Sequence, residues 1–280
     1  MKTFAAVVIL TCVGLAVLAE VNRREAVRRD RRHEGARLTE PESALLVEVR
    51  RLHAKLGSQV WPGFADARVP IVLFNDAYEF LADAVDPPTP WEIVPDHRLD
   101  GSVYYRRAVG NPQGFAVRIG DLWAGSLSTL ARVNRDFFLA VRRDLPPVLA
   151  QVYPYAWATV APDLHVVALL HEMFHAHQAS TTPERFAAAG ALYEVEKRYP
   201  FADAAFSDEW DAEGAALAAA LRSLDIGETR ELVRTFLSRR GARRSRAGLD
   251  AKLLAFEREL EWLEGLGKYV ETRFHELAAA

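Results

Sequence analysis

The amino-acid sequence predicts an α+β protein, with a small, mostly antiparallel sheet in the N-terminal half and a mainly α-helical C-terminal half. Half of the 280 residues are hydrophobic, which is enough for a substantial buried core. Short runs rich in β-branched and aromatic residues lie between positions 69 and 130, bounded by proline, glycine, asparagine and aspartate. From position 164 onward the sequence has long stretches of helix-forming residues with few breakers.

The first forty residues are expected to precede the folded body. Residues 1–19 contain an apolar run, which we interpret as a signal peptide or a membrane anchor. Residues 20–40 are rich in arginine and predict a charged linker or an exposed helix. A basic stretch at this place is typical of an uncleaved anchor with that side in the cytoplasm. The sequence therefore predicts a secreted or periplasmic protein, or alternatively one that the N-terminal segment anchors to a membrane.

Residues 41–280 are expected to form a single domain, with a mixed α/β part over 41–161 and a helical part over 162–280. Its first element is a helix from Ser43 to Leu56, since apolar residues recur there at helical spacing and Gly57 closes it. The runs that predict strands are Val69–Phe74, Ser102–Tyr105 and Phe115–Ile119.

Composition excludes several classes of function. The formal net charge is −3, so no basic field is available to attract nucleic acid, and we expect no nucleic-acid partner. The single cysteine, Cys12, excludes an internal disulfide framework and a cysteine-based metal site.

The most informative segment has the pattern HExxH and spans His171 to His175, within an apolar stretch from Leu164 to Ala179 that lacks proline and glycine. On a helix, histidines four residues apart share one face, so that both imidazoles can bind one zinc ion. Glu172 lies beside them and is suited to act as a general base rather than as a ligand. The pattern predicts a Zn²⁺ site with His171 and His175 as ligands and Glu172 as the catalytic residue.

A catalytic zinc ion usually has three protein ligands, and a third must come from elsewhere in the chain. The residues after His175 do not continue into HExxHxxGxxH, which excludes the metzincin arrangement. Two downstream glutamates are candidates, and each precedes a glycine: Glu213 and Glu264. Glu213 lies on an apolar stripe, where its carboxylate would need a partner. Glu264 has charged neighbours in the sequence. The same pattern is typical of a helix face that is exposed to solvent.

The segment from Glu264 to Tyr269, together with the HExxH pattern, resembles the gluzincin class of zinc peptidases, in which a Glu-Gly-x-Ala-x-Tyr segment supplies the glutamate ligand. The resemblance implies a zincin-like catalytic domain with Glu264 as the third metal ligand, and Glu213 stays the alternative. It also implies an edge strand beside the metal helix, for which Phe115–Ile119 is the candidate. In gluzincins the glutamate follows about one helix after the histidines. The longer distance here predicts an inserted helical hairpin.

These observations predict a zinc-dependent hydrolase, specifically a peptidase, that cleaves a peptide or protein with a metal-activated water and Glu172 as general base. An additional hydrogen-bond donor at the reacting carbonyl is expected from Tyr269, His177 or His275. The first alternative is a zinc-stabilised binding or scaffold protein without catalytic activity. A second is a membrane-surface interaction protein that acts through its arginine-rich stretch.

Overall fold

The computed structural model describes residues 2–155 and 159–279, with side chains described from residue 14 onward in the first helix. The described chain forms two compact units, one made of Met1–Thr181 with Gly267–Ala280 and the other made of Thr182–Leu266. The expectation of one catalytic domain over 41–280 stays a prediction.

The first unit contains a mixed sheet to which the described residues contribute six strands, in the spatial order β3-β4-β2-β1-β6-β5. Its strands are β1 (Ile71–Phe74), β2 (Tyr78–Ala82), β3 (Glu92–Ile93), β4 (Tyr105–Ala108), β5 (Phe115–Ile119) and β6 (Leu122–Ser128). All neighbouring pairs are antiparallel except β1 and β6, which run parallel. The mostly antiparallel sheet and the α+β class predicted from the sequence are confirmed.

Strand β5 lies at one edge of the sheet, as the sequence-based hypothesis of an edge strand requires. It pairs with β6 through a register that sets Ala116 opposite Gly125 and Val117 opposite Ala124. Because successive side chains of a strand point to opposite faces, Ala124 and Gly125 belong to different faces of the sheet. Ala124 lies in an apolar cluster with Val72, Leu81, Trp91 and Ile119.

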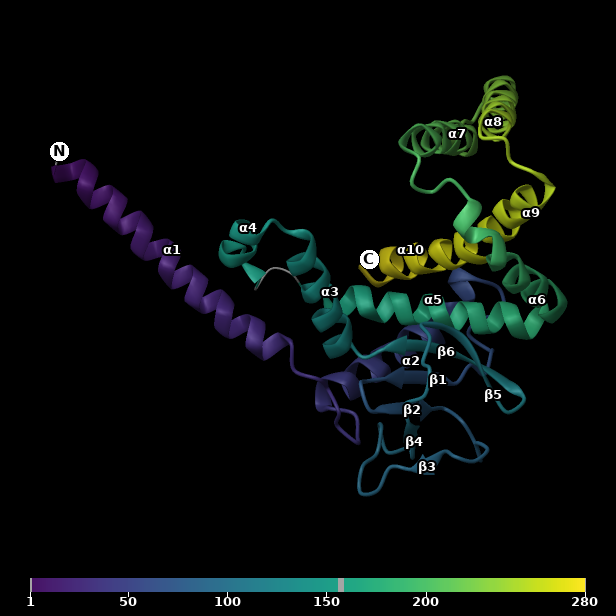
Figure 1. The fold of residues 1–280 in the computed structure, drawn as a ribbon. Helices are drawn as coiled ribbons and strands as arrows, with labels where there is room; N and C mark the ends of the chain where they lie inside the picture. The colour runs from purple at the N-terminus through teal and green to yellow at the C-terminus, as the bar shows by residue number, and fades with distance from the viewer. Residues whose placement is uncertain (1, 156–158, 280) are drawn as a thin grey trace. The chain divides into compact units, whose positions relative to one another are not determined.

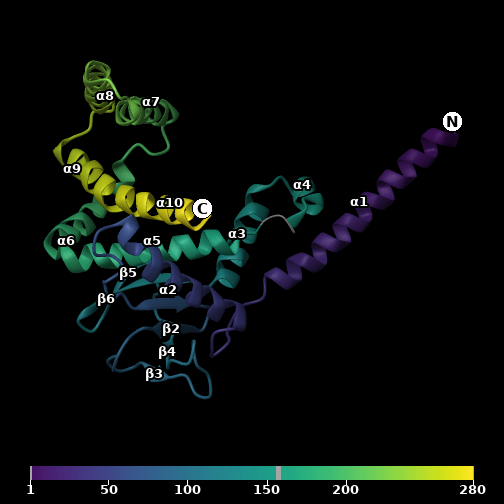
Figure 2. The ribbon, with the colours of Figure 1, turned by 180° about the vertical axis from the view of Figure 1, so that it is seen from behind.

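Helix α5 (Pro162–Thr181) covers the face of the sheet to which Gly125 belongs, and α2 (Glu40–Val60) packs beside it (Figure 1). A Cβ atom added to Gly125 would lie 2.6 Å from the backbone nitrogen of Met173 and 2.9 Å from the carbonyl carbon of Glu172. Glycine is thus required for the strand and the helix to approach this closely. In both views α10 (Leu266–Ala279) runs along α5 (Figures 1 and 2).

The N-terminal helix α1 (Lys2–Arg29) continues through the expected boundary between residues 19 and 20. Its C-terminal half packs on α3 (Leu130–Asp144) and α4 (Pro147–Val152), where Ala26 contacts Phe138 and Tyr155. The expected signal peptide or anchor falls largely on residues 1–13, whose side chains lie outside the described part of the structure. Within the part that is described, no helix combines the length and the apolar character needed to cross a membrane.

The second unit is helical throughout its regular elements. These are α6 (Pro183–Leu192), the 3₁₀ helix η2 (Tyr193–Arg198), α7 (Ala204–Arg222), α8 (Ile226–Arg246), α9 (Ala251–Leu260) and the π-helical turn η3 (Glu261–Gly265). Asp203, Asp225 and Asp250 are the N-caps of α7, α8 and α9, and each accepts a hydrogen bond from a backbone N–H of the first turn. An apolar core joins η2, α7 and α9 and contains Val195, Tyr199, Phe206, Leu253 and Phe256.

Candidate metal centre

The imidazole rings of His171 and His175 face one another from successive turns of α5. Their Nε2 atoms lie 2.8 Å apart, and the ring centroids are 4.5 Å apart. His175 is 1% exposed, and His171 is half-buried. The helix therefore directs one nitrogen of each ring toward a single point, as the i, i+4 spacing predicts.

The other nitrogen of each ring lies near an oxygen atom. Nδ1 of His175 lies 2.9 Å from Oε1 of Gln178, and Nδ1 of His171 lies 3.3 Å from a carboxylate oxygen of Glu271 on α10, without the geometry of a hydrogen bond. An amide oxygen can only accept, so Nδ1 of His175 carries the proton. Nε2 of His175 then directs its lone pair toward Nε2 of His171, as a metal-binding imidazole does.

Gly267, in the first turn of α10, lies directly against this pair of rings. A Cβ atom added to it would be 2.7 Å from Nε2 of His171 and 3.1 Å from Cε1 of His175. Any larger residue at this position would fill the space next to both nitrogens. The glycine keeps that space open.

Two strands of the sheet complete the surroundings of the histidines. Gly125 of β6 allows the backbone of Glu172 and Met173 to pack directly against the sheet. This contact fixes the distance of the Glu172 backbone from the sheet. Phe115, the first residue of the edge strand β5, has its ring centroid 4.7 Å from that of His175. Helix α5 and the edge strand β5 are thus neighbours.

Glu264 lies in the π-helical turn η3, three residues before Gly267, in a helical stretch that continues into α10. Among the described residues, His171, His175 and Glu264 form a group of potential ligands whose ligand atoms lie within 4.8 Å of one another. The structure thus brings together the three ligands predicted from the sequence, although metal binding by them stays a prediction.

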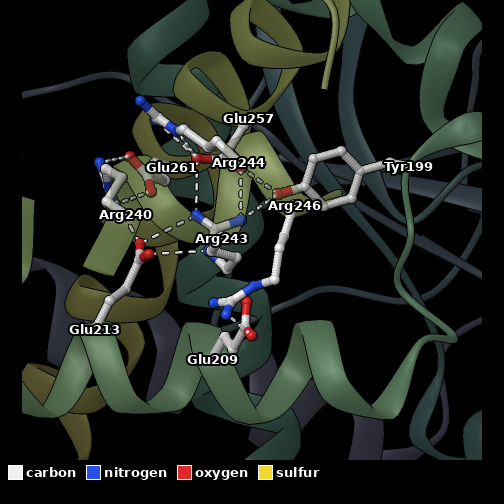
Figure 3. Close-up of polar contacts among 9 residues, drawn as sticks. All are labelled: Tyr199, Glu209, Glu213, Arg240, Arg243, Arg244, Arg246, Glu257 and Glu261. Atoms are coloured by element: carbon white, nitrogen blue, oxygen red, sulfur yellow. Dashed lines mark hydrogen bonds and ion pairs between the residues drawn. The ribbon is translucent and has the colours of Figure 1, made fainter. Parts of the chain in front are cut away.

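Glu213, the alternative third ligand, is occupied by arginines of its own unit (Figure 3). It is 1% exposed, and its Oε2 accepts from Nε of Arg243 at 2.9 Å. Its Oε1 accepts from Nε of Arg240 at 3.0 Å and from Nη2 of Arg243 at 3.1 Å. A metal ion would have to displace two guanidinium groups, so the geometry does not support Glu213 as a ligand.

The residues proposed from the sequence as additional donors have different surroundings. His177 packs between Phe64 and Phe174 at centroid distances of 5.4 and 5.8 Å, and burial lowers the pKa of its imidazole, which keeps it neutral. Tyr269 is 46% exposed, and His275 lines a small cavity near the end of α10. None of these contacts singles out one donor, and a role at a reacting carbonyl stays a prediction for each.

The donor set fits a divalent transition-metal ion. Two imidazoles and a carboxylate form a common set of ligands for catalytic zinc and also for non-haem iron(II), with a position left for water. The contact of His175 Nδ1 with Gln178 also matches the second layer of hydrogen bonds that metal-binding histidines usually make. Three residues of this arrangement were not predicted from the sequence: Gln178, Gly267 and Glu271. Helical spacing could have indicated Gln178, which follows His175 by one turn.

The chain matches no protein-family model, and neither a curated protein nor a solved structure matches it significantly.

Proposed function

We propose that this protein is a zinc-dependent hydrolase that cleaves amide bonds in a peptide or protein substrate. In this proposal His171, His175 and Glu264 bind the ion, and Glu172 is the general base. The observation that carries it is the convergence of the two Nε2 atoms, 2.8 Å apart, on successive turns of α5, together with the contact of His175 Nδ1 with Gln178. Two imidazoles that converge in this way are a common means of binding a catalytic metal ion.

Zinc bound at this place would lower the pKa of a water molecule toward neutrality and polarise the carbonyl of the scissile bond. Glu172 would accept a proton from the attacking water and deliver it to the leaving amine nitrogen. Gln178 would hold the imidazole of His175 in the required tautomer through Nδ1, and Glu271, 3.3 Å from Nδ1 of His171, would add negative charge beside the second ring. The edge strand β5 would align an extended substrate by backbone hydrogen bonds beside His175.

The conservative replacement Glu172→Gln tests the proposal. Wild-type protein, Glu172→Gln, His175→Ala and the surface control Glu184→Gln would be loaded with zinc, analysed for bound metal and incubated with a mixture of internally quenched peptides. Glu184 is an exposed acid in the first turn of α6. We expect Glu172→Gln to keep its zinc but lose hydrolysis, His175→Ala to lose both, and Glu184→Gln to behave as wild type.

Two results would count against the proposal. A wild-type protein that holds no zinc would exclude the metal site. A protein that holds zinc equally in wild type and Glu172→Gln but cleaves no peptide would favour the alternative of a non-catalytic, zinc-stabilised binding protein.

A further inference from the structure

Tyr193 makes a contact that neither the motif nor the proposed reaction explains. Its hydroxyl donates a hydrogen bond to Oε1 of Glu264, with an oxygen–oxygen distance of 3.0 Å. Both residues belong to the second unit, although 71 positions separate them in the sequence. A hydrogen bond from a phenol to an ionised carboxylate is stronger than one between neutral groups. It therefore favours one orientation of the Glu264 carboxylate over the others that a helical glutamate can adopt.

The Tyr193 ring is itself fixed by packing. It begins the 3₁₀ helix η2 and meets the ring of Phe256 edge-on, at a centroid distance of 5.7 Å and an angle of 85°. It lies against the apolar cluster that joins η2, α7 and α9. Because a tyrosine has only two flexible side-chain torsions, such packing leaves its hydroxyl with little freedom. The packing therefore holds the Tyr193 hydroxyl in position to donate its hydrogen bond to Glu264.

Two further sets of side-chain contacts hold the turn that contains Glu264. Oε2 of Glu261 accepts a hydrogen bond from Nη1 of Arg240 at 3.2 Å. Arg185 donates to Glu259 at 2.8 Å, and its guanidinium carbon lies 4.3 Å from the centre of the Trp262 ring. These contacts fix the turn but do not reach the carboxylate of Glu264.

The turn itself is unusual, because η3 has π-helical hydrogen bonding. Such turns are rare, widen the helix by one residue and occur preferentially at functional sites. In η3 the wide turn comes between the glutamates that pair with arginines, Glu257 and Glu261, and the helix that carries Gly267. The π turn determines toward which side of the helix Glu264 projects, and the hydrogen bond from Tyr193 restrains the orientation of the Glu264 carboxylate.

We propose that Tyr193 is a positioning residue of the metal centre, which orients the carboxylate of Glu264 toward the ion through its hydrogen bond to Oε1. This inference rests on the proposed role of Glu264 as the third ligand. Residues that orient metal ligands in this way typically contribute about tenfold to hundredfold to metal affinity.

The test compares Tyr193→Phe with Tyr199→Phe. Tyr199 is a matched control, because its hydroxyl also donates to a buried helix-borne glutamate, Glu257, at 2.5 Å and packs in the same apolar cluster. Zinc affinity of the full-length protein would be measured by competition with a chromophoric chelator. The visible spectrum of the Co²⁺-substituted protein would report the coordination geometry. The variant Glu264→Gln gives the zinc affinity and the spectrum expected when the proposed ligand is lost.

We expect Tyr193→Phe to weaken zinc binding by about tenfold or more and to change the Co²⁺ spectrum. Tyr199→Phe should leave both unchanged, even if it lowers thermal stability more, since it leaves a fully buried carboxylate with one donor fewer. Equal zinc affinity and equal spectra in Tyr193→Phe and wild type would overturn this inference while leaving the proposed function intact. Equal losses in both variants would overturn it too, because the effect would then be structural. A wild-type protein without zinc affinity would end both proposals.

Discussion

At position 267 the chain has a glycine inside a regular helix, where glycine costs up to about 1 kcal/mol relative to alanine. Its backbone is not in the left-handed region, so the turn itself does not call for glycine. The surroundings of this position require glycine, because a Cβ atom would lie 2.7 Å from Nε2 of His171. The absence of a single methyl group thus leaves room for an ion beside two imidazoles.

Replacing Gly267 by alanine is therefore expected to reduce zinc affinity by at least about tenfold while the helix stays folded. Gly265→Ala is the matched control, because no atom lies within 4 Å of the Cβ position there. Isothermal titration of both variants with zinc, together with circular dichroism, would measure the effect. Wild-type affinity in Gly267→Ala would show that the ion, if bound, lies elsewhere.

The sequence predicted some residues of the site and missed others for a physical reason. His171, Glu172 and His175 can be recognised because their relationship is local to one helix. Gln178 and Glu271 belong to no motif, and their importance arises from packing. Whether the carboxylate of Glu271 points to an imidazole or to solvent depends on how α10 lies along α5, which the sequence does not specify.

At the scale of elements, α7, α8 and α9 are joined by buried charges rather than by apolar packing alone (Figure 3). Arg243 is completely buried, and its guanidinium donates to both Glu213 and Glu257. Arg244 and Tyr199 also donate to Glu257. Burial acts to raise the pKa of Glu257, but the hydrogen bonds from these donors outweigh it and hold that pKa below its ordinary value.

Arg243→Met should destabilise the second unit by about 3–5 kcal/mol, because it leaves two buried carboxylates without their main partner. Arg234→Ala removes an exposed ion pair with Glu231 one turn away on the same helix and should cost less than about 1 kcal/mol. Urea unfolding followed by circular dichroism would compare the two. Adding Glu213→Gln and Glu257→Gln to Arg243→Met should restore part of the loss, and no recovery would argue that lost packing is the cause.

The strands show where sequence patterns become unreliable. The predicted strand Phe115–Ile119 has the same bounds as β5, since it is rich in aromatic and β-branched residues and is bounded by turn residues. The predicted strand Ser102–Tyr105 shares only Tyr105 with β4, because strand bounds depend on the pairing partner. Strand β6 was missed, and its sequence contains glycine and serine in place of β-branched residues. Gly125, which weakens the local signal, is the residue that the helix contact requires.

For the whole molecule, the long distance between His175 and Glu264 predicted an inserted helical hairpin. In the structure residues Thr182–Leu266 form a unit of their own that includes Glu264, and the hairpin stays a prediction. The apolar composition predicted a large core correctly, but the sequence alone did not indicate where one core ends and another begins. Glu213 illustrates the difficulty. Its place on an apolar stripe was recognised, while its arginine partners, on another helix, were not.

If the proposed site binds zinc, the ion should stabilise the folded chain. A ligand that binds only the native state at a concentration one hundred times its dissociation constant contributes about 2.7 kcal/mol. We therefore expect added zinc to raise the melting temperature and a chelator to reverse the shift, as measured by calorimetry. The double variant His171→Ala and His175→Ala should show no shift. An identical shift in that variant would mean that zinc acts at another place.

The first unit is assembled from two stretches of chain, one on each side of Thr182–Leu266. A ribosome therefore produces the histidine pair long before it reaches Gly267 and Glu271, and domains begin to fold while synthesis continues. Until then the helix that carries Gly267 and Glu271 is absent from the surroundings of the two histidines. The proposed metal centre, and any activity that depends on it, would therefore form only after the intervening segment has been translated.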